Sequence, residues 1–162
     1  DRYTNKYEHW DMDIFGWKYN MDNIQAALLI NQVDQINENL KKRELISNRY
    51  EDAFFRVNEI DFPKTPKIST SARHLFTIWV NPEKRDYILH MLQGRDIGVA
   101  VNYQAIHLLK YFRKTFNYKR GDFPIAEEIG NKTISLPLYP ALSNKEIDKI
   151  IDSTIDICGS SD

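Results

Sequence analysis

Residues 75 to 80, Leu75-Phe76-Thr77-Ile78-Trp79-Val80, form an apolar run rich in β-branched and aromatic side chains. The pair Asn81-Pro82, which is typical of turns, follows at once. This pattern predicts a buried β-strand over 75–80. Two shorter runs of the same character predict further strands over 99–103 and 134–136.

The sequence before this strand is helical in pattern. Neither Gly nor Pro occurs between residues 21 and 62, and Asp22 with Gln25 three residues later is a plausible N-terminal cap. Apolar residues recur in steps of three and four, which places them on one face of a helix. They form two stripes that are out of phase: Leu29, Val33, Ile36, Leu40, and then Ile46, Tyr50, Ala53, Val57. The pattern predicts two helices, or one long helix with a bend near residues 40 to 44.

The sequence after the strand alternates between helix and strand signals. Helices are predicted over 84–93, after an Asp122 cap with Pro124 in the first turn, and from the capping box of Ser143 and Glu146 onward. We expect Glu127 and Glu128 on a solvated helix face. Together these elements predict an α/β (α+β) sandwich with a small, mostly antiparallel sheet of about three strands, a long N-terminal helix or helix pair, and C-terminal helices.

We expect three parts along the chain: an irregular aromatic loop over 1–20, one globular domain over 21–158, and a tail over 159–162. The loop carries six aromatic residues without clean periodicity: Tyr3, Tyr7, Trp10, Phe15, Trp17 and Tyr19. The chain opens with Asp1 and its first methionine is Met12, so we expect it to be part of a longer protein.

Composition excludes several classes of function. The chain has 22 Lys and Arg against 23 Asp and Glu, without the basic excess of a nucleic-acid-binding protein. No apolar run approaches the ~20 residues of a membrane helix. The lone Cys158 cannot form an internal disulfide, which favours a reducing, cytoplasmic compartment.

Pattern alone assigns no chemistry. The four histidines, His9, His74, His90 and His107, are too dispersed for a recognised metal site, so no metal is expected. No glycine-rich phosphate loop is present.

Six blocks of sequence together resemble the DegT/DnrJ/StrS-type sugar aminotransferases, in family order and at about family spacing. The first is Gly16-Trp17-Lys18-Tyr19-Asn20-Met21 followed by Asp22-Asn23-Ile24-Gln25-Ala26-Ala27. The others lie at residues 73–76, 96–103, 106–108, 121–128 and 135–140. The resemblance covers residues 14 to 157 and implies the small, C-terminal domain of a fold-type-I aminotransferase.

The resemblance implies an activity for the full-length protein. Such enzymes use pyridoxal 5'-phosphate (PLP) to transfer an amino group, usually from glutamate, to a keto sugar attached to a nucleotide. The lysine that binds PLP covalently, and its accompanying aspartate, lie in a large N-terminal domain that has no counterpart here. We therefore expect no catalytic residue in this chain and no covalently bound PLP on the chain alone.

The resemblance also implies binding residues. The loop with Lys18 and Asn20 resembles the one that reaches the phosphate of the partner subunit's PLP, and either residue can be the contact. Tyr19, Asn102, Tyr103 and His107 are the candidates for the sugar side. Asn102 departs from the family pattern, which has histidine there; an amide can hydrogen-bond a sugar hydroxyl but does not titrate near neutral pH.

Three readings of the chain remain open from the sequence. It is a part of a sugar-nucleotide aminotransferase, a non-catalytic binding or assembly module with the same fold, or one half of a split enzyme. The helix over 22–40 carries apolar residues on more than one face, so we expect homodimerisation through it and the preceding loop.

Overall fold

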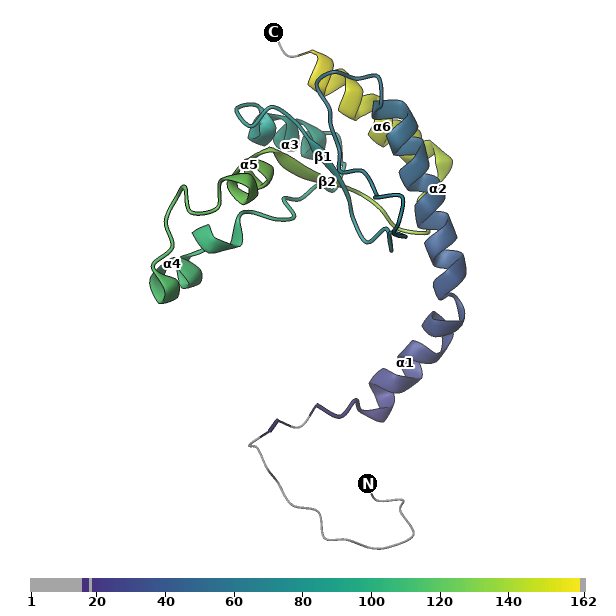
Figure 1. Cartoon of the computed structure of the whole chain (residues 1–162). Helices are drawn as coiled ribbons and strands as arrows, with labels where there is room; N and C mark the ends of the chain where they lie inside the picture. Colours follow the sequence, from purple (N-terminus) through teal and green to yellow (C-terminus); the bar gives the residue numbers. More distant parts are fainter. Residues whose placement is uncertain (1–15, 18, 161–162) are drawn as a thin grey trace, which may run out of the picture. The chain divides into compact units, whose positions relative to one another are not determined.

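The computed structural model describes residues 16, 17 and 19–160. The chain divides into two compact units, Asp1–Gln35 and Ile36–Asp162. Figure 1 follows the elements in chain order.

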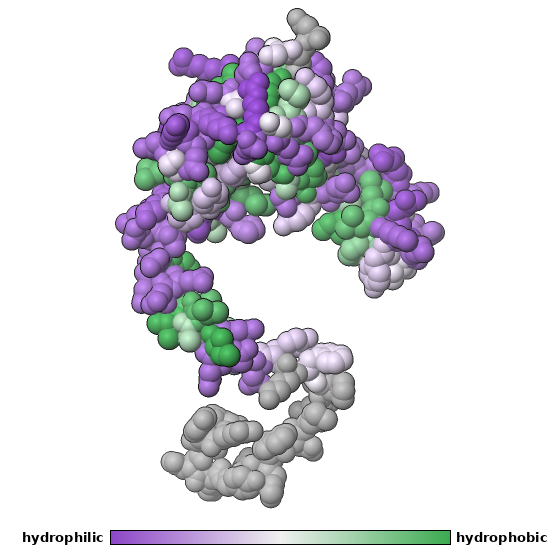
Figure 2. Space-filling view, turned by 180° about the vertical axis from the view of Figure 1, so that it is seen from behind, coloured by the Kyte–Doolittle hydropathy of each residue, from purple (hydrophilic) through white to green (hydrophobic). Residues whose placement is uncertain are grey.

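Among the described residues of the first unit, Asn23–Asp34 form helix α1. Asp22 is its N-cap, as predicted, and the Oδ1 atom of Asp22 accepts a hydrogen bond of 2.8 Å from the backbone N–H of Gln25. No residue of α1 is buried. Its apolar side chains are therefore exposed, as Figure 2 also shows for part of the helix.

The second unit begins with α2, Ile36–Phe54. The two helices are separated at Gln35, so the sequence-based alternative of two helices is correct and that of one long helix with a bend near residues 40 to 44 is wrong. Gln35 is neither Gly nor Pro, and the apolar stripe runs through it without interruption, so nothing in the local pattern marks this position.

The sheet consists of β1, Phe76–Trp79, and β2, Thr133–Leu136. The strands are antiparallel, with Phe76 opposite Leu136 and Trp79 opposite Thr133. The predicted third strand over 99–103 is wrong in extent, because only Ala100 forms a bridge, to Ser135. The chain leaves the sheet edge soon after Ala100, where residues 104 and 105 pack against a helix instead. The predicted α/β fold class itself is confirmed.

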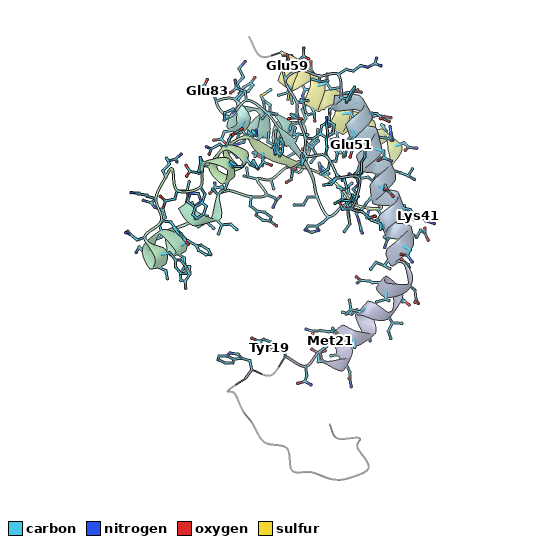
Figure 3. All side chains as sticks on the ribbon, viewed as in Figure 1. Tyr19, Met21, Lys41, Glu51, Glu59 and Glu83 are labelled. Atoms are coloured by element: carbon cyan, nitrogen blue, oxygen red, sulfur yellow. The ribbon has the colours of Figure 1, made fainter. Side chains whose placement is uncertain are left out.

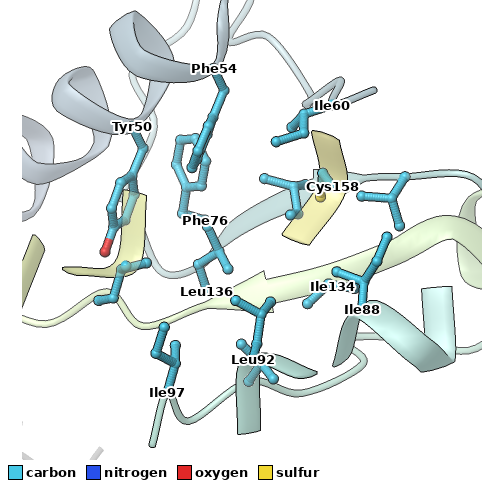
Figure 4. Packing of buried hydrophobic residues seen from close by; sticks show 14 of the residues in the cluster. Tyr50, Phe54, Ile60, Phe76, Ile88, Leu92, Ile97, Ile134, Leu136 and Cys158 are labelled. Carbon is cyan, nitrogen blue, oxygen red and sulfur yellow. The ribbon is translucent and has the colours of Figure 1, made fainter. Parts of the chain in front are cut away.

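Three helices enclose the core of this unit: α2, α3 (Arg85–Gly94) and α6 (Asn144–Gly159). Tyr50 and Phe54 of α2 lie against Phe76 of β1, with the Tyr50 and Phe76 ring centroids 5.0 Å apart (Figure 4). α6 packs against both α2 and α3. The predicted capping box at its start is confirmed, because Ser143 and Glu146 each accept a hydrogen bond from the other's backbone N–H.

The remaining elements project from one side of the sheet in Figure 1. They are the 3₁₀ turn η1, Ile106–Leu108, and the helices α4, Lys110–Phe116, and α5, Pro124–Lys132. Pro124 occupies the first turn of α5, as predicted. Asp122 is not its cap: the N-cap is Phe123, and the Asp122 carboxylate instead accepts from the backbone N–H of Lys119 at 2.9 Å.

Candidate functional site

An open pocket of about 610 Å³ lies among η1, α4 and α5. Two residues singled out by the sequence, Tyr103 and His107, line it together. Tyr103 is 65% exposed and His107 is buried, so the pocket offers one accessible phenol and one enclosed imidazole. Most of the remaining lining is apolar: Ala105, Ile106, Phe112, Phe116, Phe123, Ala126 and Ile129, with Gln104 and Tyr118.

His107 is held in place by a buried carboxylate. Its Nε2 atom lies 2.9 Å from Oε1 of Glu127, which comes from α5. The backbone N–H of Gly121 donates to the same oxygen at 2.7 Å. The Gly121 hydrogen bond, then that from His107 and the positive charge of Arg120, lower the pKa of Glu127 despite its burial.

These contacts indicate which ring nitrogen of His107 carries a hydrogen atom. A carboxylate with a lowered pKa is ionised near neutral pH and can only accept hydrogen bonds. Nε2 of His107 therefore carries hydrogen and donates to Glu127, which leaves Nδ1 as the remaining polar atom of the ring.

Aromatic rings form the wall beside His107. Phe123 lies 4.9 Å from the His107 ring between centroids, Tyr118 lies 5.5 Å from Phe123, and Phe116 lies 5.6 Å from Tyr118. Figure 2 shows apolar surface on the projecting part that contains α4. A wall of ring faces with few polar groups suits a ligand that has both an apolar face and hydroxyl groups.

The expectation of a solvated face was wrong for Glu127 and correct for Glu128. Glu128 is exposed and pairs with Lys132 at 2.8 Å, whereas Glu127 is buried. Glu127 and Gly130, three residues apart, are the buried residues of α5. A search for apolar periodicity misses this face because neither of its buried residues is apolar.

The other described candidate residues do not line this pocket. Asn102 is partly buried and is not part of the pocket lining, although a cis peptide bond joins it to Tyr103. Tyr19 and Asn20 belong to the first unit and are exposed, and Figure 3 labels Tyr19 just before α1. Lys18 lies outside the described residues.

Neither a metal-binding cluster nor a helix suited to cross a membrane occurs in residues 16, 17 and 19–160. No group of three or more His, Cys, Asp or Glu side chains in this range could hold a metal ion. No helix in the same range combines the length and apolar content needed to span a membrane.

The fold of this chain is similar to the folds of proteins whose structures have been solved. Spr1654 from Streptococcus pneumoniae, in its PLP form, is 28% identical with a TM-score of 0.84, covering 96% of this chain and 40% of that one. DesV from S. venezuelae is 23% identical with a TM-score of 0.86, covering 97% and 42%, and at this identity shows the fold alone.

Sequence comparison identifies the family. The spore coat polysaccharide biosynthesis protein SpsC of Bacillus subtilis (strain 168) is 32% identical over 159 residues, which are 95% of this chain and 41% of SpsC. The chain thus spans about two fifths of the length of the relatives that it matches. The model of the DegT/DnrJ/EryC1/StrS aminotransferase family matches residues 1–154. The chain therefore belongs to the DegT/DnrJ/EryC1/StrS aminotransferase family.

Proposed function

We propose that the chain is the C-terminal portion of a PLP-dependent aminotransferase that transfers an amino group from glutamate to a nucleotide-linked keto sugar. The family match over residues 1–154 supports amino-group transfer. The PLP form of Spr1654 supports the cofactor, and the name of SpsC supports a role in polysaccharide biosynthesis. Glycan and antibiotic sugars are further destinations for such a product.

The pocket lined by Tyr103 and His107 is the proposed binding site for the sugar. Both residues line one cavity. The exposed Tyr103 hydroxyl can donate to a sugar oxygen or accept from a hydroxyl. His107 offers Nδ1 while Glu127 fixes the orientation of its ring. Asn102 and Tyr19 are also proposed as sugar-binding residues, although neither lines this pocket.

We assign the cofactor contact to the segment just before α1. When bound, PLP supplies the electron-withdrawing ring on which amino-group transfer depends. Asn20 is exposed, and its amide can donate to a phosphate oxygen. The nearby carboxylate of Asp22 accepts from the backbone N–H of Gln25 as the cap of α1, so it leaves the Asn20 amide available as a donor. Asn20 or Lys18 would reach the phosphate of the partner subunit's PLP in a homodimer.

The proposed arrangement follows the sequence-based division of the chain: a reaching loop over 1–20, the small domain over 21–158 and a tail over 159–162. The lysine that holds PLP covalently would lie elsewhere in the full-length protein. The chain alone would then neither bind PLP covalently nor transaminate. We place the full-length enzyme in the cytoplasm.

Amino transfer by the full-length protein tests the proposal. Glutamate is supplied with a panel of nucleotide-linked keto sugars, and the amino sugar product is detected by mass spectrometry. Tyr103→Phe should lower kcat/KM about tenfold, since it removes one hydrogen bond to the substrate. Tyr87→Phe, at an exposed tyrosine on α3, is the matched control and should leave kcat/KM unchanged. Absence of amino transfer across the panel would contradict the proposed function.

Cofactor retention tests the reaching loop separately. Asn20→Ala and Lys18→Ala are compared by the amount of PLP that stays with the full-length protein during gel filtration. The variant that removes the true phosphate contact should lose PLP but keep the melting temperature of the wild-type protein. Unchanged retention in both variants would contradict the role assigned to this loop.

A further inference from the structure

The two ring nitrogens of His107 lie in different surroundings. Nε2 lies 2.9 Å from Oε1 of Glu127, and the same oxygen accepts a hydrogen bond of 2.7 Å from the backbone N–H of Gly121. This oxygen acts as an acceptor, so the hydrogen between it and Nε2 belongs to His107. In the neutral ring, Nδ1 then has a lone pair and no hydrogen.

Nδ1 remains within reach of a ligand. Among the described residues it has no hydrogen-bond partner, and it is not one of the buried side-chain atoms that lack a partner. An atom that is neither bonded nor buried reaches the surface, although the His107 side chain is only 6% exposed. His107 lines the pocket of about 610 Å³ and does not line the neighbouring pocket around Arg85 and Arg120. The pocket of η1, α4 and α5 is therefore the place where a ligand meets Nδ1.

The other polar side chains of this pocket can adapt to either kind of ligand group. The hydroxyls of Tyr103 and Tyr118 donate or accept, and the amide of Gln104 has both a donor and an acceptor. Nδ1 of His107 only accepts, because the ring hydrogen is held at Nε2 by Glu127. A keto oxygen, a carboxylate or a phosphate facing Nδ1 would place two acceptors against each other with no hydrogen between them.

We propose that His107 determines specificity in this pocket by accepting a hydrogen bond at Nδ1 from a hydroxyl group of the sugar. The proposal rests on the proposed function, because it takes this pocket as the sugar site. Glu127 is a positioning residue, since a rotation that exchanged the two ring nitrogens would break its hydrogen bond to Nε2. The keto group of the sugar, which only accepts, then points away from His107.

Nitrogen-15 NMR of histidine side chains tests the state of the ring. The full-length protein is labelled at histidine, and the His107 signals are identified by their loss in His107→Phe/Glu127→Gln. The amide introduced at position 127 can still accept from Gly121 and leaves no buried charge. We expect a hydrogen on Nε2 and none on Nδ1. A hydrogen on Nδ1, in a neutral or a charged ring, would overturn the proposal whether or not the protein transfers amino groups.

Binding without turnover tests the hydroxyl contact. In the absence of glutamate, calorimetry compares nucleotide-linked keto sugars with analogues in which one sugar hydroxyl is replaced by hydrogen. For one hydroxyl, the replacement should weaken binding to the wild type about tenfold, because it leaves Nδ1 covered and unpaired. The same replacement should not change binding to His107→Phe/Glu127→Gln. His90→Phe, at an exposed histidine on α3 outside the pocket, is the matched control and should keep the tenfold preference.

The outcomes separate this proposal from the proposed function. Amino transfer without any hydroxyl whose effect depends on His107 would overturn the proposal alone. A hydroxyl preference that depends on His107, without amino transfer, would support the site and contradict the activity. Absence of sugar binding would contradict both.

A second variant covers the case in which the double variant fails to fold by circular dichroism. His107→Gln, whose amide can still donate to Glu127, then identifies the NMR signals. In the wild type, the hydroxylated sugar should shift the Nδ1 signal and its analogue without the hydroxyl should not. Equal shifts with the two sugars would overturn the proposal.

Discussion

Nε2 of His107 and Oε1 of Glu127 lie 2.9 Å apart, and both side chains are almost fully enclosed. The same carboxylate oxygen accepts from Gly121 at 2.7 Å. One oxygen atom therefore joins η1, the loop before α5 and α5 itself. These are the elements that shape the aromatic pocket, so the pocket's form depends on Glu127 being ionised.

Replacing Glu127 should change how stability depends on pH. The folded state lowers the pKa of Glu127 from its ordinary 4.5, so its contribution is fully present above about pH 4.5 and is lost as the pH falls through the lowered value. Glu127→Gln should lower the melting temperature at neutral pH and flatten its decline in acid. Melting temperatures between about pH 7 and about pH 3 measure this. The neighbouring Glu128→Gln should keep the wild-type profile, and a Glu127→Gln profile parallel to wild type would contradict the role of the carboxylate.

Gly130→Ala should destabilise the protein by about 1–3 kcal/mol. An added Cβ would lie 2.8 Å from the backbone N of Ala105 and 3.3 Å from Gln104, and backbone atoms cannot simply rotate away. This cost outweighs the roughly 0.5–1 kcal/mol that alanine gains over glycine inside a helix. Urea unfolding measures the difference.

Gly94→Ala is the matched control for that substitution. Gly94 ends α3 and has nothing within 4 Å of the added Cβ, so this change should be neutral or slightly stabilising. Equal effects at the two glycines would show that the contact between α5 and residues 104–105 is not tight.

Cys158 should resist alkylation in the native protein. Burial raises the pKa of its thiol to about 11, and the negative charge of Glu59 contributes in the same direction. The reactive thiolate is then about one part in ten thousand at neutral pH. Iodoacetamide labelling followed by intact-mass measurement should be slow in buffer and rapid in guanidinium chloride. Equal rates in the two conditions would contradict the burial of Cys158.

The exposed apolar side chains of α1 should drive self-association of the chain. Ile24, Leu28 and Val33 are 77%, 67% and 62% exposed, and such surface usually finds a partner. Light scattering at tens of micromolar should give a mass that rises with concentration, and Leu28→Glu should suppress the rise. Asn31→Glu, on the same helix, adds the same charge without removing apolar surface and should associate as the wild type does. A mass of one chain at all concentrations would contradict the expected dimer.

Features specified by neighbouring residues were predictable from the sequence. The capping box of Ser143 and Glu146, the Asp22 cap and the strand around Ile78 each depend on a few adjacent side chains. Features that arise from contacts distant in the sequence were not predictable. Glu127 was expected on a solvated face because its partner His107 is 20 residues away. Arg85 and Arg120 line one pocket, and this was not predictable for the same reason, because they come from different parts of the chain.

The short sheet also limits how these molecules can join one another. Trp79, on the open side of β1, already exchanges backbone hydrogen bonds with Asp61, and Ser135, on the open side of β2, does so with Ala100. With strands of four residues, little unpaired backbone remains at either edge to template a strand from a neighbouring molecule. Strand addition and the fibrous aggregation that follows from it are thereby disfavoured. Association of two copies at this sheet would then depend on side-chain contacts, which a single surface substitution can disrupt.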